Sequence, residues 1–264
     1  MITDAQLRTL ARKDGVTAGL AEKNYVNSWI LYTLYDSQLG DDLVFKGGTA
    51  LSKLYFPEIW RFSEDLDFTV AQPVPGLDVR LGEALDGIES QSGITFDLRN
   101  IHRAGDSPVE YVQVKVQYEA VLGHRNTTKL DLDFTEGLAF PVQTHRHDFE
   151  DVPGFELSAY SIEEILVEKL RSLFQRARAR DYYDIYRLLA QHSFDDPKIA
   201  EALTEKSREQ DVSIDLENGI PDDDIDDVRA YWDRALDRLV QSKPPFDEVV
   251  DSIDEYLRQL ETLR

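Results

Sequence analysis

This sequence of 264 residues contains no cysteine. It also lacks the apolar run of a membrane-spanning helix and the apolar core of a secretory signal. Without thiols the chain has no disulfide, no thiolate zinc site and no cysteine nucleophile. No apolar run approaches the roughly 18 residues that a membrane-spanning helix needs. The first residues, 1–15, also lack the apolar core of a secretory signal. We therefore expect a cytoplasmic protein that does not enter a membrane.

Lysine is scarce, whereas acidic residues are abundant. Only 10 of the 29 basic residues are lysine, while 31 Asp and 20 Glu bring the net charge to −22. An Asp-rich, Lys-poor surface is typical of a protein kept soluble in concentrated salt, where self-repulsion is screened, so we expect a halophilic source. This charge opposes diffuse binding to nucleic-acid phosphates. It also makes solvated surface the default interpretation of any single Asp.

The hydrophobic pattern divides the chain into a mixed N-terminal part and a helical C-terminal part. In the first part we expect helices over 17–36, capped by Thr17, and over 77–92, with strands at 41–45, 64–70, 94–101, 109–119 and 128–135. His145 and His147 are assigned to a polar loop and to no metal site. The pattern predicts an α/β (α+β) domain over 1–155 and an all-helical domain over 156–264.

In the helical part, Ser161 and Glu164 have the spacing of a capping box before the run "ILVEKLRSLF". The helical pattern continues to about residue 190, with a break predicted near 178–181. Two more helices are expected near 226–241 and 246–263.

Two short Asp-Leu-Asp segments carry the first candidate chemistry. Because side chains alternate along a strand, Asp65 and Asp67 share one face, and so do Asp131 and Asp133. If the two strands are neighbours, their carboxylates repel one another unless a cation lies between them. Hard divalent ions such as Mg²⁺ take oxygen ligands together with substrate phosphates. In so acidic a chain the competing interpretation is ordinary solvated surface.

A glycine turn precedes the first of these segments. Gly47 and Gly48 permit close backbone approach, and Thr49 begins a helix whose first amides favour an anion. Lys53 lies about one turn further on and is a candidate for binding a phosphate. Ser63 is a candidate for orienting a metal ligand or a phosphate. Alone, a Gly-Gly pair before a helix is more often a structural turn.

Residues 169–180 contain five basic side chains and no acid, which is conspicuous in this chain. The simpler interpretation is a solvated helix stripe with partners such as Glu164 for Lys169. The functional interpretation is a binding surface for a triphosphate or an RNA backbone, with Lys169 and Arg176 on one helix face. Asp181 would then hold one of these cations or position the acceptor. Of the tyrosines at 182, 183 and 186, at least two are expected to pack in the core.

Together with their flanks, these motifs resemble a known family. A strand, a Gly-Gly-Thr turn, an S-x-D-x-D strand and a later acidic strand form the arrangement of the polymerase β-like nucleotidyltransferase superfamily. Within it, "FKGGTALSKLY" and "RFSEDLDF" resemble the AbiEii/AbiGii toxin family, to which the MenT toxins are related. The segment 161–189 resembles the C-terminal signature of that family. The resemblance covers about residues 40–190.

The resemblance implies a polymerase β-like domain with a mixed sheet, followed by a helical domain, and it implies roles residue by residue. The nucleotide-phosphate turn is matched by Gly47, Gly48 and Thr49, and its helix lysine by Lys53. Ser63, Asp65 and Asp67 match the metal motif. Asp131 matches the third carboxylate, with Asp133 as the alternative two positions on. Lys169 and Asp181 match the lysine and aspartate of the later motifs.

The family resemblance also implies an activity. It implies transfer of a nucleotide from an NTP (GTP, CTP or UTP) with Mg²⁺ or Mn²⁺, the tRNA 3′ end being the expected acceptor. The protein would be the toxin of a toxin–antitoxin or phage-defence pair, with an AbiEi-like transcriptional regulator as antitoxin. Two alternatives remain open: nucleotide transfer to a protein side chain, and a non-catalytic module that binds GTP or a partner.

Overall fold

The computed structural model describes residues 1–56, 61–70, 72, 74–105, 109–176 and 178–263, and the chain divides into two compact units. The sheet unit comprises Met1–Glu136 and Val142–Tyr160, and the helical unit comprises Gly137–Pro141 and Ser161–Arg264. A strand runs through residues 155 and 156, where the sequence led us to expect a domain boundary. The sequence also gave no sign that 137–141 belongs with the helices.

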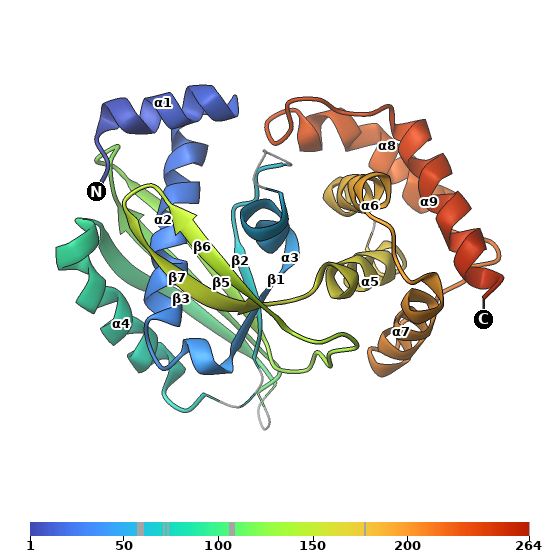
Figure 1. The fold of residues 1–264 in the computed structure, drawn as a ribbon, viewed down its shortest axis with the longest axis horizontal. Helices are drawn as coiled ribbons and strands as arrows, with labels where there is room; N and C mark the ends of the chain where they lie inside the picture. Colours follow the sequence, from blue (N-terminus) through green and yellow to red (C-terminus); the bar gives the residue numbers. More distant parts are fainter. Residues whose placement is uncertain (57–60, 71, 73, 106–108, 177, 264) are drawn as a thin grey trace. The chain divides into compact units, whose positions relative to one another are not determined.

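Among its described residues, the sheet unit contains a mixed sheet of seven strands in the order β3-β4-β5-β2-β1-β7-β6 (Figure 1). Strands β1 and β7 run parallel, as do β2 and β5, whereas the other neighbours are antiparallel. The strands are β1 (Leu43–Lys46), β2 (Leu66–Val70), β3 (Thr95–Ala104), β4 (Tyr111–Glu119), β5 (Arg125–Asp133), β6 (Gln143–Phe149) and β7 (Val152–Ala159).

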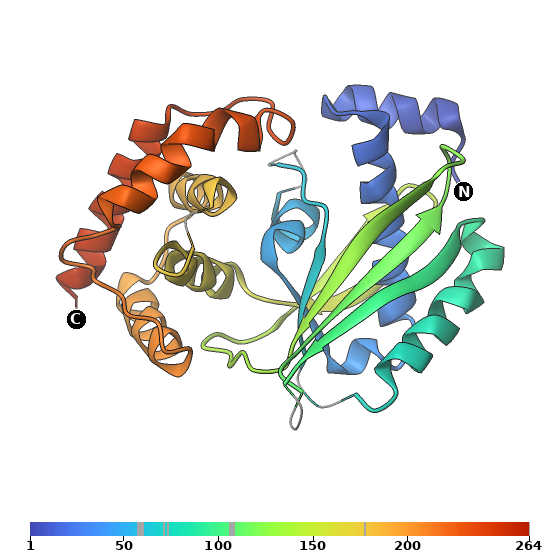
Figure 2. The same ribbon diagram turned by 180° about the vertical axis from the view of Figure 1, so that it is seen from behind.

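Helices cover part of this sheet. Helix α2 packs against β7 and α4, and α4 packs against β3, as the two opposite views show (Figures 1 and 2). The predicted cap of α2 is confirmed, because the Thr17 hydroxyl accepts the Leu20 N–H. The elements are α1 (Asp4–Asp14), α2 (Ala18–Tyr35), the 3₁₀ turn η1 (Gly40–Asp42), α3 (Gly47–Ala50), the π-helical turn η2 (Leu51–Tyr55) and α4 (Leu77–Ser92).

The core of the sheet unit follows from the alternation of its strands. Leu66 and Phe68 of β2 are fully buried, and Leu130 and Leu132 of β5 are nearly so. Asp67, between Leu66 and Phe68, and Asp131, between Leu130 and Leu132, are polar and only half-buried. Alternate valines and Tyr118 of β4 extend the same buried face. One face of the sheet is therefore core, and the other is left for polar side chains.

One expectation for this region is wrong. His145 and His147 do not lie in a loop but in strand β6. His147 is buried and hydrogen-bonded to the Ser28 hydroxyl, while His145 contacts the Tyr55 hydroxyl. Pairing with β7 gives this polar segment its strand conformation, because the ladder depends on the neighbouring strand rather than on local apolar pattern.

In the part of the helical unit that the structure describes, five helices surround their own core. Helix α5 packs against α6 and α7, and α9 packs against α6, α7 and α8. The helical pattern is interrupted, but earlier than the predicted 178–181: α5 ends at Leu173, and α6 begins at Ala179, within the predicted break. The helices are α5 (Ile162–Leu173), α6 (Ala179–Gln191), α7 (Asp196–Glu209), α8 (Asp222–Leu236) and α9 (Phe246–Glu261). Within the described ranges, none of the helices has the length and apolarity required to span a bilayer.

The start of α5 only partly matches the expected capping box. The Ser161 hydroxyl accepts the Glu164 N–H at 3.2 Å, as predicted. The Glu164 carboxylate does not turn back to the Ser161 N–H, because it accepts the N–H groups of Ala139 and Phe140 instead. Tertiary contacts, which the local pattern does not contain, decide where this side chain is used.

Replacing Phe68 by alanine tests this assignment of the core. We expect Phe68→Ala to lower the free energy of unfolding by about 3–5 kcal/mol, because a fully buried aromatic ring leaves a cavity. Val79→Ala on α4 is the matched control: Val79 is 61% exposed, and its loss should change stability by less than about 0.5 kcal/mol. Urea unfolding followed by circular dichroism measures both. Equal midpoints for the two variants would contradict the core assignment.

Candidate active site

The polar face of the sheet brings together residues from the two Asp-Leu-Asp segments. In the parallel pairing of β2 and β5, Asp67 is the partner of Asp131, and Thr69 is the partner of Asp133. Asp65 directly precedes β2. Two carboxylates that are 64 positions apart in the chain thus become strand neighbours on one face. The sequence predicted this pairing only on the condition that the strands were adjacent.

Asp131 is held by two donors from the neighbouring strand β4. The Tyr111 hydroxyl donates to Oδ1 of Asp131, and Gln113 Nε2 donates to the same oxygen at 2.8 Å. Burial, together with the Asp131 charge, raises the pKa of Tyr111, so its hydroxyl stays protonated and remains a donor. Two donors on one oxygen restrict the rotation of the Asp131 carboxylate and leave its second oxygen for another partner.

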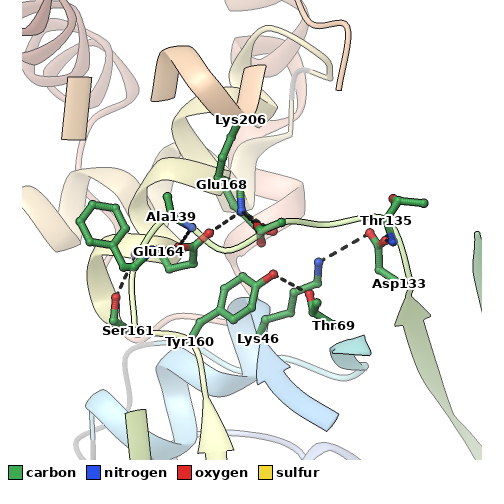
Figure 3. Close-up of polar contacts among 12 residues, drawn as sticks. Lys46, Thr69, Asp133, Thr135, Ala139, Tyr160, Ser161, Glu164, Glu168 and Lys206 are labelled. Carbon is green, nitrogen blue, oxygen red and sulfur yellow. Dashed lines mark hydrogen bonds and ion pairs between the residues drawn. The ribbon is translucent and has the colours of Figure 1, made fainter. Parts of the chain in front are cut away.

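Asp133 has a different set of contacts (Figure 3). Its Oδ1 accepts the N–H and the hydroxyl of Thr135 at 2.8 and 2.9 Å, and its Oδ2 lies 3.7 Å from Lys46 Nζ. Lys46 also lies 5.5 Å from the centre of the Tyr160 ring, and the Tyr160 hydroxyl contacts Thr69. Asp133 therefore caps the end of β5 and pairs with a cation, whereas Asp131 lies beside Asp67.

The two glycines of the turn are required by close approach. Gly47 has φ +77°, and a β-carbon there would lie 2.5 Å from Oδ2 of Asp67. A β-carbon on Gly48 would overlap the guanidinium of Arg61, which is itself buried. The buried Thr49 hydroxyl donates to the carbonyl of Asp65. The turn is thus in contact with Asp67 and with Arg61, and it helps to hold Asp65.

The electrostatics of this face show mutual repulsion among its acids. Burial raises the pKa of Asp65, the nearby Lys129 opposes that rise, and the charge of Asp131 adds to it. Within the described residues, no three His, Asp or Glu side chains are gathered into a ready metal site. The donor set nevertheless fits a hard divalent cation in kind, because carboxylates are its preferred ligands and a cation would relieve this repulsion.

A cavity of about 280 Å³ lies within the sheet unit, next to the glycine turn. Its polar lining includes Ser52, Lys53, Arg61 and Ser63, so two of the residues predicted to bind a nucleotide lie on it. Its size is close to the lower end of small-molecule sites. Since Arg61 contacts Gly48 as well, the cavity and the turn share a cationic side chain.

Lys53 directs its ammonium toward helix α2. Its Nζ donates to the carbonyl and the Oδ1 of Asn24 at 3.0 and 2.6 Å and to the Ser28 hydroxyl at 2.8 Å. Burial lowers the pKa of Lys53 to about 7. The lysine that the sequence assigned to phosphates therefore lines the cavity as a cation that readily loses its proton.

The remaining predicted residues lie in the helical unit. Lys169 is buried and pairs with Asp181 at 2.9 Å and with Asp184 at 2.7 Å. Arg176 Nε lies 3.6 Å from Asp181. Burial acts to raise the pKa of Asp181, but the charges of Lys169 and Arg176 outweigh it and lower this pKa. The expectation that Asp181 holds a cation of the basic run is confirmed.

Two other expectations for this run are wrong. Lys169 and Arg176 do not share a helix face, because α5 ends at Leu173. Nor is the run a solvated stripe, since Lys169 and Arg171 are both buried. The expectation for the tyrosines is confirmed: Tyr182 and Tyr183 pack in the core.

Sequence reasoning did not find Tyr111 and Gln113 as partners of Asp131. Both lie in a predicted strand, and their alternation with buried valines places them on its polar face. Which residue of β5 they oppose depends on the strand register, and no local signal in the sequence specifies it.

Lys169 provides a test of the helical unit. Lys169→Met should lower the free energy of unfolding by about 3–5 kcal/mol, because it leaves Asp181 and Asp184 charged and buried without this cation. Lys198→Met is the matched control, since Lys198 is exposed and a solvent-screened surface pair such as that with Asp195 contributes little to stability. Thermal unfolding of both variants is the measurement. A melting temperature for Lys169→Met no lower than that of the control would refute the buried cluster.

Comparison with known proteins gives one family match and similar solved structures. Residues 29–257 match the family described as nucleotidyl transferase AbiEii toxin, type IV toxin–antitoxin system. Among solved structures, the fold is similar to MenT4, a nucleotidyltransferase toxin from Mycobacterium tuberculosis H37Rv. The TM-score is 0.75 at 20% identity, over 100% of this chain and 93% of that one. No curated protein matches the chain. Since the family match spans most of its length, the chain belongs to the AbiEii nucleotidyltransferase toxin family, and its activity is nucleotide transfer.

Proposed function

We propose that this toxin transfers a nucleotide from an NTP to an RNA acceptor, with the tRNA 3′ end as the expected site, in a reaction that requires Mg²⁺ or Mn²⁺. The observation that carries the proposal is the pairing of Asp67 with Asp131 on the polar face, beside a glycine turn whose neighbour Arg61 also lines a cavity. The adjacent gene is expected to encode the antitoxin, an AbiEi-like regulator, and the pair is expected to act in phage defence.

Asp65, Asp67 and Asp131 would hold the metal. When bound, a divalent cation polarises the α-phosphate and lowers the pKa of the acceptor hydroxyl. Asp131 is preferred to Asp133 because Asp133 is occupied by Thr135 and Lys46, whereas Asp131 lies beside Asp67. Tyr111 and Gln113 would keep the Asp131 carboxylate in one orientation during turnover.

The triphosphate is assigned to the glycine turn and the cavity beside it. Gly47 and Gly48 let the side chains of Asp67 and Arg61 lie against the backbone of the turn, and Thr49 positions Asp65 through its hydrogen bond. From the cavity wall, Arg61 supplies a positive charge, Lys53 supplies a second one when it is protonated, and Ser63 supplies a hydroxyl. In the helical unit, Lys169 would neutralise developing charge, with Asp181 and Arg176 as its neighbours.

Replacing single carboxylates tests the metal assignment. We expect Asp67→Asn and Asp131→Asn each to reduce nucleotide transfer by about 100-fold or more, because a metal ion contributes several kcal/mol to the transition state. Asp133→Asn is the matched control on the same strand and should lose less than about tenfold. The measurement is the transfer of label from each of the four NTPs to total RNA and total protein, at low and high KCl.

The outcomes of that assay are distinct. A loss in Asp133→Asn equal to that in Asp131→Asn would remove the preference for Asp131. Full transfer by Asp67→Asn would overturn the metal site. Label that enters only protein would replace the RNA acceptor by a protein side chain, and the absence of any Mg²⁺-dependent NTP consumption would leave a binding module.

The pKa of Lys53 predicts a pH dependence for triphosphate binding. As the pH falls from about 8.5 to about 6.5, Lys53 gains its proton and becomes a cation, so the affinity for tripolyphosphate should increase several-fold. The control is Lys53→Arg, because a guanidinium stays charged throughout this range. Isothermal titration calorimetry measures the affinity of both proteins for tripolyphosphate. Protonation of the tripolyphosphate itself affects both proteins alike, so the ratio of their affinities reports on Lys53.

The other charged groups at the cavity set the background of this experiment. His147, whose pKa burial lowers to about 3, stays neutral over this range. An affinity ratio between wild type and Lys53→Arg that is constant with pH would show that Lys53 does not contribute. The other charged lining residues are Lys13, Asp14, Arg61, Asp148 and Glu150.

A further inference from the structure

Three basic side chains, the basic row, extend across strands β3, β4 and β5 of the sheet unit, which lie side by side (Figure 2). Arg99 of β3 is the register partner of Lys115 of β4, and Lys115 is the partner of Lys129 of β5. Residues directly opposite one another share a sheet face. Because Lys129 lies two positions before Asp131 on β5, the basic row lies on the same polar face as the carboxylates.

The stability of the sheet does not explain the basic row. Like charges directly opposite one another on neighbouring strands are destabilising. Lys115 and Lys129 are half-buried, and among the described residues neither ammonium group has a hydrogen bond or an ion pair. Arg99 contacts Asp97 of its own strand, but this pair is exposed to solvent and contributes little. Two neighbouring lysines without an acidic partner are unexpected in a chain of 51 acidic residues.

Charge compensation within the chain accounts for only one member of the basic row. Burial raises the pKa of Asp65, and the charge of Lys129 opposes that rise. Lys115 lies one strand further away from β2, and Arg99 lies two strands further away. An anion from outside the chain would supply the missing partner, since phosphate oxygens form strong, charge-assisted hydrogen bonds with ammonium and guanidinium groups.

The position of the basic row relative to the carboxylates indicates which substrate it meets. In the sheet, β1 is next to β2, whereas β4 and β3 lie beyond β5. The glycine turn, to which the triphosphate is assigned, directly follows β1. In phosphoryl transfer the attacking and leaving oxygens lie roughly in line, on opposite sides of the phosphorus. If pyrophosphate leaves on the β1 side, the acceptor hydroxyl approaches from the β4 side, where the basic row lies.

We infer that the basic row binds backbone phosphates of the acceptor RNA and so guides its terminal hydroxyl to the metal site at Asp131. This inference rests on the proposed function, because it takes RNA as the acceptor. Lys129 and Asp131 are separated by about 7 Å along β5, so the phosphates bound are those of the nucleotides next to the reacting end. The net charge of −22 opposes diffuse binding of a polyanion, which makes a local cationic surface necessary.

Strand β3 offers a matched control for this inference. A β-bulge at Asn100, which has φ +43°, shifts the register of the strand. Arg99 and Arg103 therefore lie on opposite faces although they are four residues apart. Arg103 is the partner of the buried Val112 and pairs with Asp78 of α4 at 3.3 Å. Arg103→Gln thus removes the same charge from the same strand without changing the basic row.

The test compares five full-length proteins: wild type, Arg99→Gln, Lys115→Gln, Lys115→Arg and the control Arg103→Gln. Lys129 is left unchanged because its charge also acts on Asp65. Transfer of label from NTP to total tRNA gives kcat and the KM for RNA. Fluorescence anisotropy measures the affinity for an oligouridylate of about ten nucleotides at several KCl concentrations. Calorimetry measures the affinity for tripolyphosphate.

We expect the KM for tRNA to rise about five- to tenfold in Arg99→Gln and Lys115→Gln, because each loses a charged contact with a phosphate. The kcat and the affinity for tripolyphosphate should stay within about twofold of wild type, since the basic row touches neither the reacting atoms nor the cavity. The dependence of log affinity for oligouridylate on log [KCl] should become less steep by about 0.7 for each cation removed.

Two further results separate lost binding from lost structure. Lys115→Arg keeps the charge and should bind RNA within about twofold of wild type. Lys115→Gln removes one of two opposed charges, so its melting temperature should be no lower than that of wild type. Arg103→Gln should keep the KM for tRNA and the salt dependence of wild type.

The outcomes distinguish the basic row from the proposed function. Equal KM values and equal salt dependence in Lys115→Gln and Arg103→Gln would overturn the inference. A fall in tripolyphosphate affinity in Lys115→Gln, with an unchanged KM for tRNA, would assign the row to the NTP and also overturn it. If wild type transfers no nucleotide to RNA, the proposed function fails. Oligouridylate binding that Lys115→Gln loses and Arg103→Gln keeps would still support an RNA phosphate site, and equal binding by all five proteins would refute it.

Discussion

The parallel pairing of β2 with β5 is the constraint on which the candidate active site depends. Leu66 and Phe68 share one buried face with Leu130 and Leu132, so the alternate residues, Asp67 among them, emerge together on the opposite face. A slip of one residue would move the carboxylates into the core and expose the leucines. The strand register that buries the leucines and Phe68 therefore also gathers the carboxylates on the polar face. The free-energy cost of burying a carboxylate or exposing a leucine maintains this register.

Most of the few lysines of this acidic chain are at least half-buried. Of the ten, Lys13 and Lys198 are the exposed ones, while Lys169 and Lys206 are buried among carboxylates. A flexible ammonium contacts several acceptors at once: Lys169 of α5 pairs with two aspartates of α6, and Lys206 contacts Glu164 and the carbonyl of Gly137. The net charge of −22 therefore resides on the surface, and the interior is locally compensated. Lysine is thus scarce in the sequence, and most of the few lysines lie in buried or half-buried positions.

Predictions from the sequence succeeded where the physical signal is local. The cap at Thr17 and the alternation of β5 follow from side-chain preferences over a few residues. The predictions failed where the conformation or the contacts of a residue depend on a partner far away in the sequence. Glu164 has the spacing of a capping box but binds the segment 137–141, and His147 lies in a strand because β7 pairs with it. Lys169 looked like part of a surface stripe because its two aspartates follow in the next helix.

By itself, the sequence determined which residues are available for the chemistry and which strand face each of them shares. It specified the Asp-Leu-Asp alternation, the glycine turn and the helix ends, since all of these depend on the nearest few residues. Only the tertiary structure decided that Asp131 rather than Asp133 lies beside Asp67, that Tyr111 and Gln113 orient it, and that Lys53 lies against α2. Those choices depend on strand register and on packing between segments far apart in the chain, which no local pattern encodes.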